Sequence, residues 1–330
     1  MNILAKNTLE KNVIRPDEEN WDESVMEANK KSWFFNPHER HPFVGLSVES
    51  AGAPRNSELG RIALARNMSP NFGDLAIPKE EWAAIAESNV ARFLKELKIP
   101  SEKVKIVRPQ ADYRDTKDPM DIINVDSVAF DLESKAGTSL QKRADFAYTR
   151  DMSTVLAIRP ADCPIITALG QTKEGPIYCM THIPWPGADS KGCERGNYID
   201  QMFAYYKELG IGFDSLRLYV SCGARAKSYS YSYGTNPLEG NPGKELLFKN
   251  VTEDNDGAFH FNIDTPFFIR DQLLKHGLDE YQIFQDTTDT ASQECGHSSH
   301  SRAKNNERKG IATTNTRDIL VASPTDYPNL

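Results

Sequence analysis

Cys163 and His182 are the residues of this chain whose types and spacing most directly suggest chemistry. Between them lie an apolar run (165–169), a segment with glycine at both ends (170–175) and a second apolar run (177–181), a pattern typical of a β-hairpin. Cys163 precedes the first of these glycines by seven positions (170 − 163), and His182 follows the last by seven (182 − 175). We therefore expect the two side chains to face each other at the open end of the hairpin, with Cβ atoms ~5 Å apart.

A thiolate and an imidazole at that separation have two chemical uses. They can bind one metal ion together, or they can act as the nucleophile and the general base of a cysteine hydrolase. The structural alternative is that Cys163 is a small buried apolar residue and that His182 is a strand-end residue bonded to backbone. The segment after His182 favours a functional role, because Trp185 lies there among two prolines and a glycine (residues 184–187), and rigid irregular loops often carry function.

Composition narrows the classes of partner. The 330 residues carry a formal net charge of −8, which argues against a nucleic-acid polymer but not against a small phosphate-bearing ligand. The first twenty residues lack the apolar run of a signal peptide, and no stretch approaches the ~20 apolar residues of a membrane span. We therefore expect a cytoplasmic protein with a small-molecule partner, no membrane contact and reduced cysteines, and leave its oligomeric state open. None of its cysteines forms a C-x-x-C motif: Cys163, Cys179, Cys193, Cys222 and Cys295.

The surrounding pattern predicts an α/β fold. Residues 1–56 are expected to be an N-terminal extension packed on the main domain, which comprises residues 57–330. Apolar residues at helical spacing predict helices after Pro78 up to Pro100, over 198–209, and from an N-cap at Thr265 to just before Gly277. Strands mixed with such helices imply an α/β sandwich. The predicted strands are 104–107, 127–130, 155–158, 165–169, 177–182, 216–221, 259–263 and 282–285.

Several short motifs resemble those of the YfiH-like proteins, formerly called multicopper polyphenol oxidases and also known as laccase-like. Ala161-Asp162-Cys163-Pro164 resembles their A-D-C-x-P, and the segment from His182 to Gly187 resembles their H-A-G-W-R-G. Their A-D-A-x-x-T, Q-x-H and S-x-R-R elements are similar to Ala144-Asp145-Phe146-Ala147-Tyr148-Thr149, to Gln110-Ala111-Asp112 and to Ser299-His300-Ser301-Arg302. The order of the motifs is kept from about residue 60 to about 322.

The resemblance implies a mixed-sheet α/β sandwich of the YfiH-like type with one metal site, for which zinc is expected and copper is the less favoured alternative. It also implies a purine nucleoside phosphorylase, an adenosine deaminase or both, so that the reaction is that of a transferase or a hydrolase. Cys163 and His182 correspond to two metal ligands of the family. Asp112 stands where the third ligand, a histidine, is usual, and it is expected as the third ligand unless it is an ordinary loop carboxylate.

The same resemblance suggests the residues that contact substrate. Trp185 is expected to line the nucleoside pocket, Asp162 to orient a ligand or brace its turn, and Arg225 and Arg302 to hold phosphate. The two arginines could instead be surface residues. Pro186 and Ser301 stand where family members have arginines. Two rival functions stay open: a metal-free cysteine hydrolase or deamidase that uses Cys163 and His182, and a degenerate relative without catalytic activity.

Overall fold

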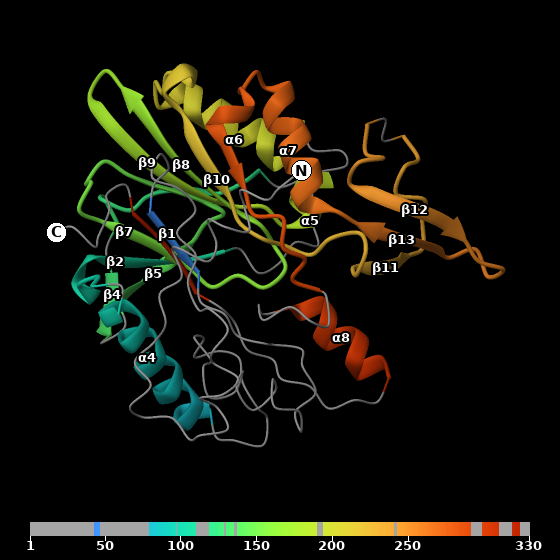
Figure 1. The fold of residues 1–330 in the computed structure, drawn as a ribbon, viewed down its shortest axis with the longest axis horizontal. Helices are drawn as coiled ribbons and strands as arrows, with labels where there is room; N and C mark the ends of the chain where they lie inside the picture. Colours follow the sequence, from blue (N-terminus) through green and yellow to red (C-terminus); the bar gives the residue numbers. More distant parts are fainter. Residues whose placement is uncertain are drawn as a thin grey trace.

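The computed structural model describes residues 43–46, 79–96, 98–109, 119–128, 130–134, 137–189, 194–240, 243–291, 299–309 and 319–323. These residues form two six-stranded mixed sheets and one three-stranded antiparallel sheet, with helices on the outside (Figure 1). The α/β sandwich predicted from the sequence is confirmed.

Among the described residues, one long helix packs on the outer face of the first sheet. Its strands, in spatial order, are β1 (Phe43–Leu46), β15 (Leu320–Ser323), β7 (Val155–Ile158), β2 (Val104–Arg108), β5 (Gly137–Arg143) and β4 (Phe130–Ser134). Strands β7, β2 and β5 are parallel, and the other neighbours are antiparallel. Helix α4 (Lys79–Glu96) packs Val90, Phe93 and Leu94 against this sheet, so its predicted apolar face does cover a sheet.

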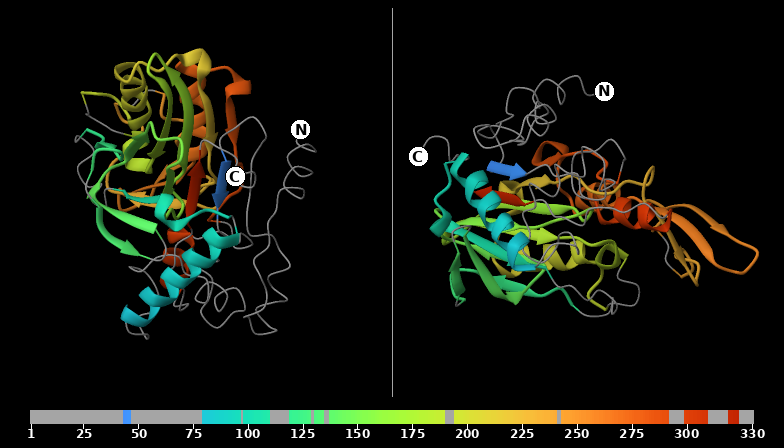
Figure 2. Two further views of the ribbon diagram at one scale, coloured as in Figure 1. Left: turned by 90° about the vertical axis from the view of Figure 1, so that its left-hand side faces the viewer. Right: turned by 90° about the horizontal axis from the view of Figure 1, so that it is seen from below.

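The second sheet holds the hairpin of interest at its centre. Its strands, in order, are β14 (Ile283–Gln285), β10 (Arg217–Val220), β8 (Ile165–Thr172), β9 (Gly175–His182), β6 (Phe146–Thr149) and β3 (Ile122–Asn124). Its outer face is covered by α5 (Trp185–Asp189), α6 (Tyr198–Glu208) and α7 (Thr265–Lys275). Figures 1 and 2 show α4 on one side of the paired sheets and α6 and α7 on the other.

This layering explains why the central strands are apolar on both faces. On β7, Leu156 and Ile158 point into the core between the sheets, while Val155 and Ala157 contact the core beneath α4. Strand β9 alternates in the same way, with its even-numbered apolar residues between the sheets and its odd-numbered ones beneath α6 and α7. Side chains alternate with a period of two, so a sheet covered on both faces needs continuous apolar runs.

The remaining elements form an arm and a closing helix. The arm consists of β11 (Ser230–Tyr233), β13 (Phe259–Ile263) and β12 (Phe248–Glu253), which project from the side of the sandwich (Figure 2). Its base is anchored where Phe248, Phe261 and Ile263 join the core beneath the helices. Helix α8 (His300–Arg308) begins after Ser299, whose hydroxyl accepts a hydrogen bond from Arg302 N. Three short 3-10 helices complete the described chain: Ser101–Lys103, Phe213–Ser215 and Glu280–Gln282.

Of the predicted N-terminal extension, the structure describes only Phe43–Leu46. This strand pairs antiparallel with β15 at the edge of the first sheet. The rest of residues 1–56 lies outside the described residues, and the boundary at residue 56 stays a prediction. Within the described part of the chain, no helix is both long enough and apolar enough to cross a membrane.

Two local predictions were wrong. The strand expected over 127–130 begins only at Phe130, because Asn124 caps a turn: its side-chain oxygen accepts from Asp126 N (3.0 Å) and its carbonyl accepts from Ser127 N (3.3 Å). The N-cap of α7 is Asp264 rather than Thr265, since the Asp264 carboxylate accepts a hydrogen bond from Phe267 N at 3.1 Å.

Candidate functional site

The hairpin that carries Cys163 and His182 is longer than its glycines suggested. Strands β8 and β9 pair from Ile165 opposite His182 to Thr172 opposite Gly175, leaving a two-residue loop. Gly170 lies inside β8, where a Cβ atom would come within 2.5 Å of Ile211 Cγ2, so close packing rather than a turn requires this glycine. The symmetric pairing predicted for Cys163 was therefore wrong: the residue opposite His182 is Ile165, two positions later (165 − 163).

A tight turn nevertheless brings the cysteine to the histidine. Asp162 adopts a left-handed conformation with φ of 66°, and Cys163 N donates to Ala161 O at 2.8 Å. Left-handed backbone is rare outside glycine, although aspartate tolerates it better than most residues. The turn redirects the chain just before β8 and brings the Cys163 side chain close enough to His182 to help raise the pKa of its imidazole. The two side chains thus converge, with half-buried Cys163 as the more accessible of the pair.

Asp145, immediately before β6, fixes the other side of the imidazole. Its carbonyl accepts from His182 N at 2.8 Å, and its carboxylate Oδ1 lies 2.9 Å from His182 Nδ1. Both residues are buried. With Nδ1 hydrogen-bonded to Asp145, a metal ion would have to bind this imidazole through Nε2. His182 is thus close both to the carboxylate of the residue before β6 and to the thiol of the turn before β8.

This environment strongly favours the protonated imidazole. Burial alone would lower the pKa of His182, but the hydrogen bond to Asp145 and the nearby Cys163 outweigh burial and raise the pKa to about 10. The metal-free protein therefore favours a proton on both ring nitrogens of His182. A metal ion that binds His182 must displace this proton, so metal binding releases protons and weakens as the pH falls.

The turn of Cys163 is itself held by residues from distant parts of the chain. Asp162 O accepts a hydrogen bond from Ala224 N at 2.9 Å, and Asp162 Oδ1 accepts one from the Thr290 hydroxyl at 2.8 Å. Just after the turn, Ile165 N donates to the Ser221 hydroxyl at 2.8 Å. The carboxylate of Asp162 is engaged by a neighbouring hydroxyl, which fits the expectation that this residue braces the turn.

Gly223 allows the segment after β10 to approach this turn. A Cβ atom at Gly223 would lie 2.7 Å from Pro164 Cγ, 2.8 Å from Asp162 O and 3.0 Å from Pro266 Cγ. Backbone and two proline rings cannot move aside easily, so only glycine fits without a shift of the turn.

We expect Gly223→Ala to destabilise the protein by ~1–3 kcal/mol, because the added methyl group overpacks the turn of Cys163. The free energy of unfolding from urea titration measures this effect. Gly234→Ala is the matched control, since a Cβ atom there would meet nothing within 4 Å. Equal stability of the two variants would contradict the close approach of Gly223 to Asp162.

Trp185 begins α5, three residues after His182. Its ring packs against Tyr231 of the arm and Phe248, with centroid distances of 5.2 and 6.2 Å. The indole is half-buried and joins α5 to the base of the arm. Its expected contact with a nucleoside stays a prediction.

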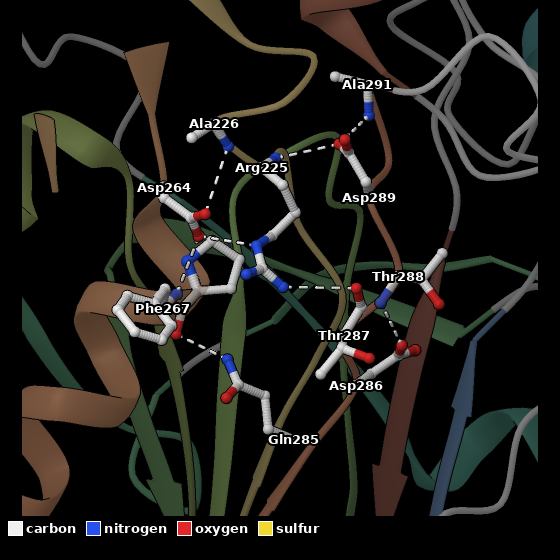
Figure 3. A network of polar contacts seen from close by, with 11 residues as sticks. Arg225, Ala226, Asp264, Phe267, Gln285, Asp286, Thr287, Thr288, Asp289 and Ala291 are labelled. Carbon is white, nitrogen blue, oxygen red and sulfur yellow. Dashed lines mark hydrogen bonds and ion pairs between the residues drawn. The ribbon is translucent and has the colours of Figure 1, made fainter. Parts of the chain in front are cut away.

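The two arginines expected to hold phosphate have different surroundings. Arg225 forms an ion pair with Asp264 (Nε to Oδ1, 2.7 Å) and reaches Thr287 O with Nη1 at 3.4 Å (Figure 3). Its side chain keeps 24% of its surface exposed. Arg302 is buried, and its Nη1 donates to Thr290 O at 3.4 Å. The alternative that Arg302 is an ordinary surface residue is therefore wrong.

Asp112, the third expected ligand, lies outside the described residues. Among the described side chains no group of three His, Cys, Asp or Glu residues is arranged to hold a metal ion.

Two residues that contact the site, Asp145 beside His182 and Thr290 beside Asp162, were not predicted from the sequence. Asp145 could have been found, because it belongs to the A-D-A-x-x-T-like motif, whereas Thr290 lies 128 residues from its partner and carries no local signal.

Comparisons with known proteins agree with this architecture. Residues 71–314 match the family model described as multi-copper polyphenol oxidoreductase laccase. No curated protein matches the sequence. The structure resembles YfiH of Bacillus licheniformis, a hypothetical protein, with 14% identity over 86% of this chain and 92% of that one, and a TM-score of 0.58. It also resembles YlmD of Geobacillus stearothermophilus, with 17% identity, the same coverages and a TM-score of 0.57.

A third solved structure, of a Neisseria meningitidis protein, is 14% identical over 88% of this chain and 98% of that one, with a TM-score of 0.54. These likenesses concern the fold. The family match extends over well more than half of the residues and includes both Cys163 and His182. The chain therefore belongs to the family of multi-copper polyphenol oxidoreductase laccases.

Proposed function

We propose that this protein is an enzyme that processes purine nucleosides, by phosphorolysis, by deamination of adenosine or by both, at a single metal site that includes Cys163 and His182. The observation that carries the proposal is the hydrogen bond between His182 Nδ1 and Asp145 Oδ1, at 2.9 Å. A metal-binding histidine typically donates its second ring N–H to a carboxylate, which fixes the ring and strengthens the ligand. Cys163 is close enough to the same imidazole to raise its pKa.

The chemistry of these two ligands suits one zinc ion. Thiolate and imidazole bind zinc well, and a set of three protein ligands leaves one position for water or substrate. Copper is the alternative, because the same donors also bind it. His260 is hydrogen-bonded to Asp254 on the arm, and His276 is hydrogen-bonded to Asp200 on α6. A cluster of several copper ions would therefore require more histidines than the described part of the site supplies.

Asp112 is the proposed third ligand. The chain leaves β2 beside the site: Arg108 O accepts a hydrogen bond from Ala144 N at 3.0 Å, and the next residue after Ala144 is Asp145. Asp112 follows Arg108 by four positions (112 − 108). A segment of this length is compatible with a carboxylate at the site. A carboxylate oxygen is a known zinc ligand, and it makes the site more negative than a histidine would.

In this proposal each group of the chain has a defined task. A bound zinc ion would supply Lewis acidity and lower the pKa of a bound water. Asp145 orients His182, while Asp162 braces the turn that presents Cys163. Trp185 is the proposed aromatic contact of the purine base. Arg225 and Arg302 are the proposed contacts of phosphate, because a planar guanidinium matches two phosphate oxygens. Arg225, which is partly exposed, is the more accessible of the two.

The same three residues support a second candidate function, a metal-free cysteine hydrolase. A cysteine beside an imidazole that is oriented by a carboxylate is the arrangement of nucleophile, base and orienting group, and the protonated His182 would then have taken its proton from Cys163. In that case the Cys163 sulfur would attack the carbonyl of an ester or amide, the alcohol or amine would leave with a proton from His182, and water would then hydrolyse the resulting acyl-enzyme thioester. The two functions share residues but differ in their need for metal and in the covalent labelling of Cys163.

The test is an assay of the full chain, purified without a metal-affinity tag and loaded with zinc. We expect adenosine or inosine with inorganic phosphate to yield free base and ribose 1-phosphate, or adenosine to yield inosine, and a chelator to stop the reaction. Chromatography of the products distinguishes the two reactions. A panel of nucleosides without product, together with cleavage of an ester or amide and labelling of Cys163, would replace this proposal with the hydrolase.

A further inference from the structure

Thr290, which has no role in the proposed chemistry, holds the turn that contains Cys163. Thr290 is 3% exposed, and its hydroxyl donates to Asp162 Oδ1 at 2.8 Å. A hydrogen bond from a buried hydroxyl to a carboxylate is charge-assisted and stronger than one between neutral groups. Asp162, directly before Cys163, has the left-handed φ of 66°, a conformation that surrounding contacts must maintain.

Thr290 is well suited to hold this carboxylate because its own backbone is fixed on both sides. Its N–H donates to Gly223 O at 3.2 Å, and its carbonyl accepts from Arg302 Nη1 at 3.4 Å. The preceding residue, Asp289, accepts hydrogen bonds from Arg225 N (3.0 Å) and Ala291 N (3.1 Å) through Oδ1 (Figure 3). The segment that contains Thr290 is thus hydrogen-bonded to Gly223, just after β10, and to Arg302 of α8.

We infer that Thr290 is a positioning residue for Cys163, acting through the carboxylate of Asp162. Its hydroxyl holds Asp162 in the left-handed conformation, and this turn directs the thiol toward His182. Arg302 contributes from a further step away, by fixing the carbonyl of Thr290. The inference rests on the proposed function, since it assigns Thr290 a part in the same site.

Three substitutions separate the role of the Thr290 hydroxyl from the role of its shape. Thr290→Val removes the hydroxyl and keeps the shape, Thr290→Ser keeps the hydroxyl, and Thr288→Val makes the same change at an exposed position two residues away. Each full-length variant is first checked for folding by thermal unfolding. Zinc affinity is then measured by competition with a chromophoric chelator, and the rate at which iodoacetamide modifies Cys163 in metal-free protein is followed by peptide mass spectrometry.

We expect Thr290→Val to weaken zinc binding about tenfold, at the low end of the range for groups that support metal ligands. In the metal-free protein it should slow alkylation of Cys163 at least about threefold, because the imidazole next to the sulfur promotes its reactivity. Thr290→Ser should restore both values, and Thr288→Val should leave them unchanged. Adding Thr290→Val to Asp162→Ala should cause little further loss, since the two residues act as one pair.

Unchanged zinc affinity and alkylation in folded Thr290→Val would overturn the inference. Equal losses in Thr290→Ser and Thr290→Val would also overturn it, because the hydroxyl would then not be the group that matters. Should Thr290→Val reduce the folded fraction, Thr290→Ala is compared with Thr290→Ser under the same criteria. If no variant or native protein turns over nucleosides, yet alkylation follows the expected order, the proposed function fails while the positioning role stands.

Discussion

Replacing Cys163 with alanine is expected to lower kcat/KM for the nucleoside reaction by about three orders of magnitude, which corresponds to ~4 kcal/mol of lost transition-state stabilisation. Cys163 is one of the two proposed ligands within the described residues, and it is close enough to the other, His182, to raise the pKa of the imidazole. Without it His182 and Asp112 alone cannot hold the ion firmly. Zinc content by elemental analysis should therefore fall together with activity, and KM should change little in any residual reaction.

Cys179→Ala serves as the matched control for this variant. Cys179 lies on β9, three residues before His182, but it faces the core beneath α6 and α7 rather than the site. Burial raises the pKa of its thiol well above the usual range, so it is not a reactive group. Full turnover in folded Cys163→Ala would exclude both the metal site and the cysteine hydrolase. Lost activity with unchanged zinc content would favour a nucleophilic role for Cys163.

Asp145→Asn is expected to weaken zinc binding and to lower kcat by ~10–100-fold, the usual effect of removing the carboxylate behind a metal-binding histidine. The amide can still accept a hydrogen bond from Nδ1–H, so the ring keeps its place. It lacks the negative charge that strengthens His182 as a ligand. Chelator competition gives the zinc affinity, and initial rates at saturating nucleoside give kcat.

The arm offers a control for this change, because Asp254 forms a similar pair with His260 (Oδ2 to Nε2, 2.8 Å) at an exposed position. Asp254→Asn should leave zinc affinity and turnover as in the native protein. Equal behaviour of Asp145→Asn and Asp254→Asn would mean that the bond between Asp145 and His182 has no part in the site. A large loss of folding stability in Asp145→Asn alone would assign the pair a structural role instead.

Local sequence patterns were enough to predict much of this molecule. The apolar face of α4, the extent of α7 and the continuous apolar runs of β7 and β9 each depend on neighbouring residues, and helical or alternating periodicity records them directly. Cys163 and His182 were found in the same way, because they flank a hairpin whose two strands are adjacent in the chain. The ordered motifs then indicated the family.

The details of the site were decided by tertiary contacts. Strand β8 continues through the expected turn, with Gly170 packed close to Ile211, and the pairing differs by two residues from the expected one. Asp145 lies 37 residues from His182, and Thr290 lies 128 from Asp162. Such contacts depend on which strands become neighbours in the sheet and on the path of the connections between them. The periodicity within one segment contains no information about either. The sequence by itself determined the elements and the reactive pair, whereas only the packed sandwich decided which buried groups hold that pair in place.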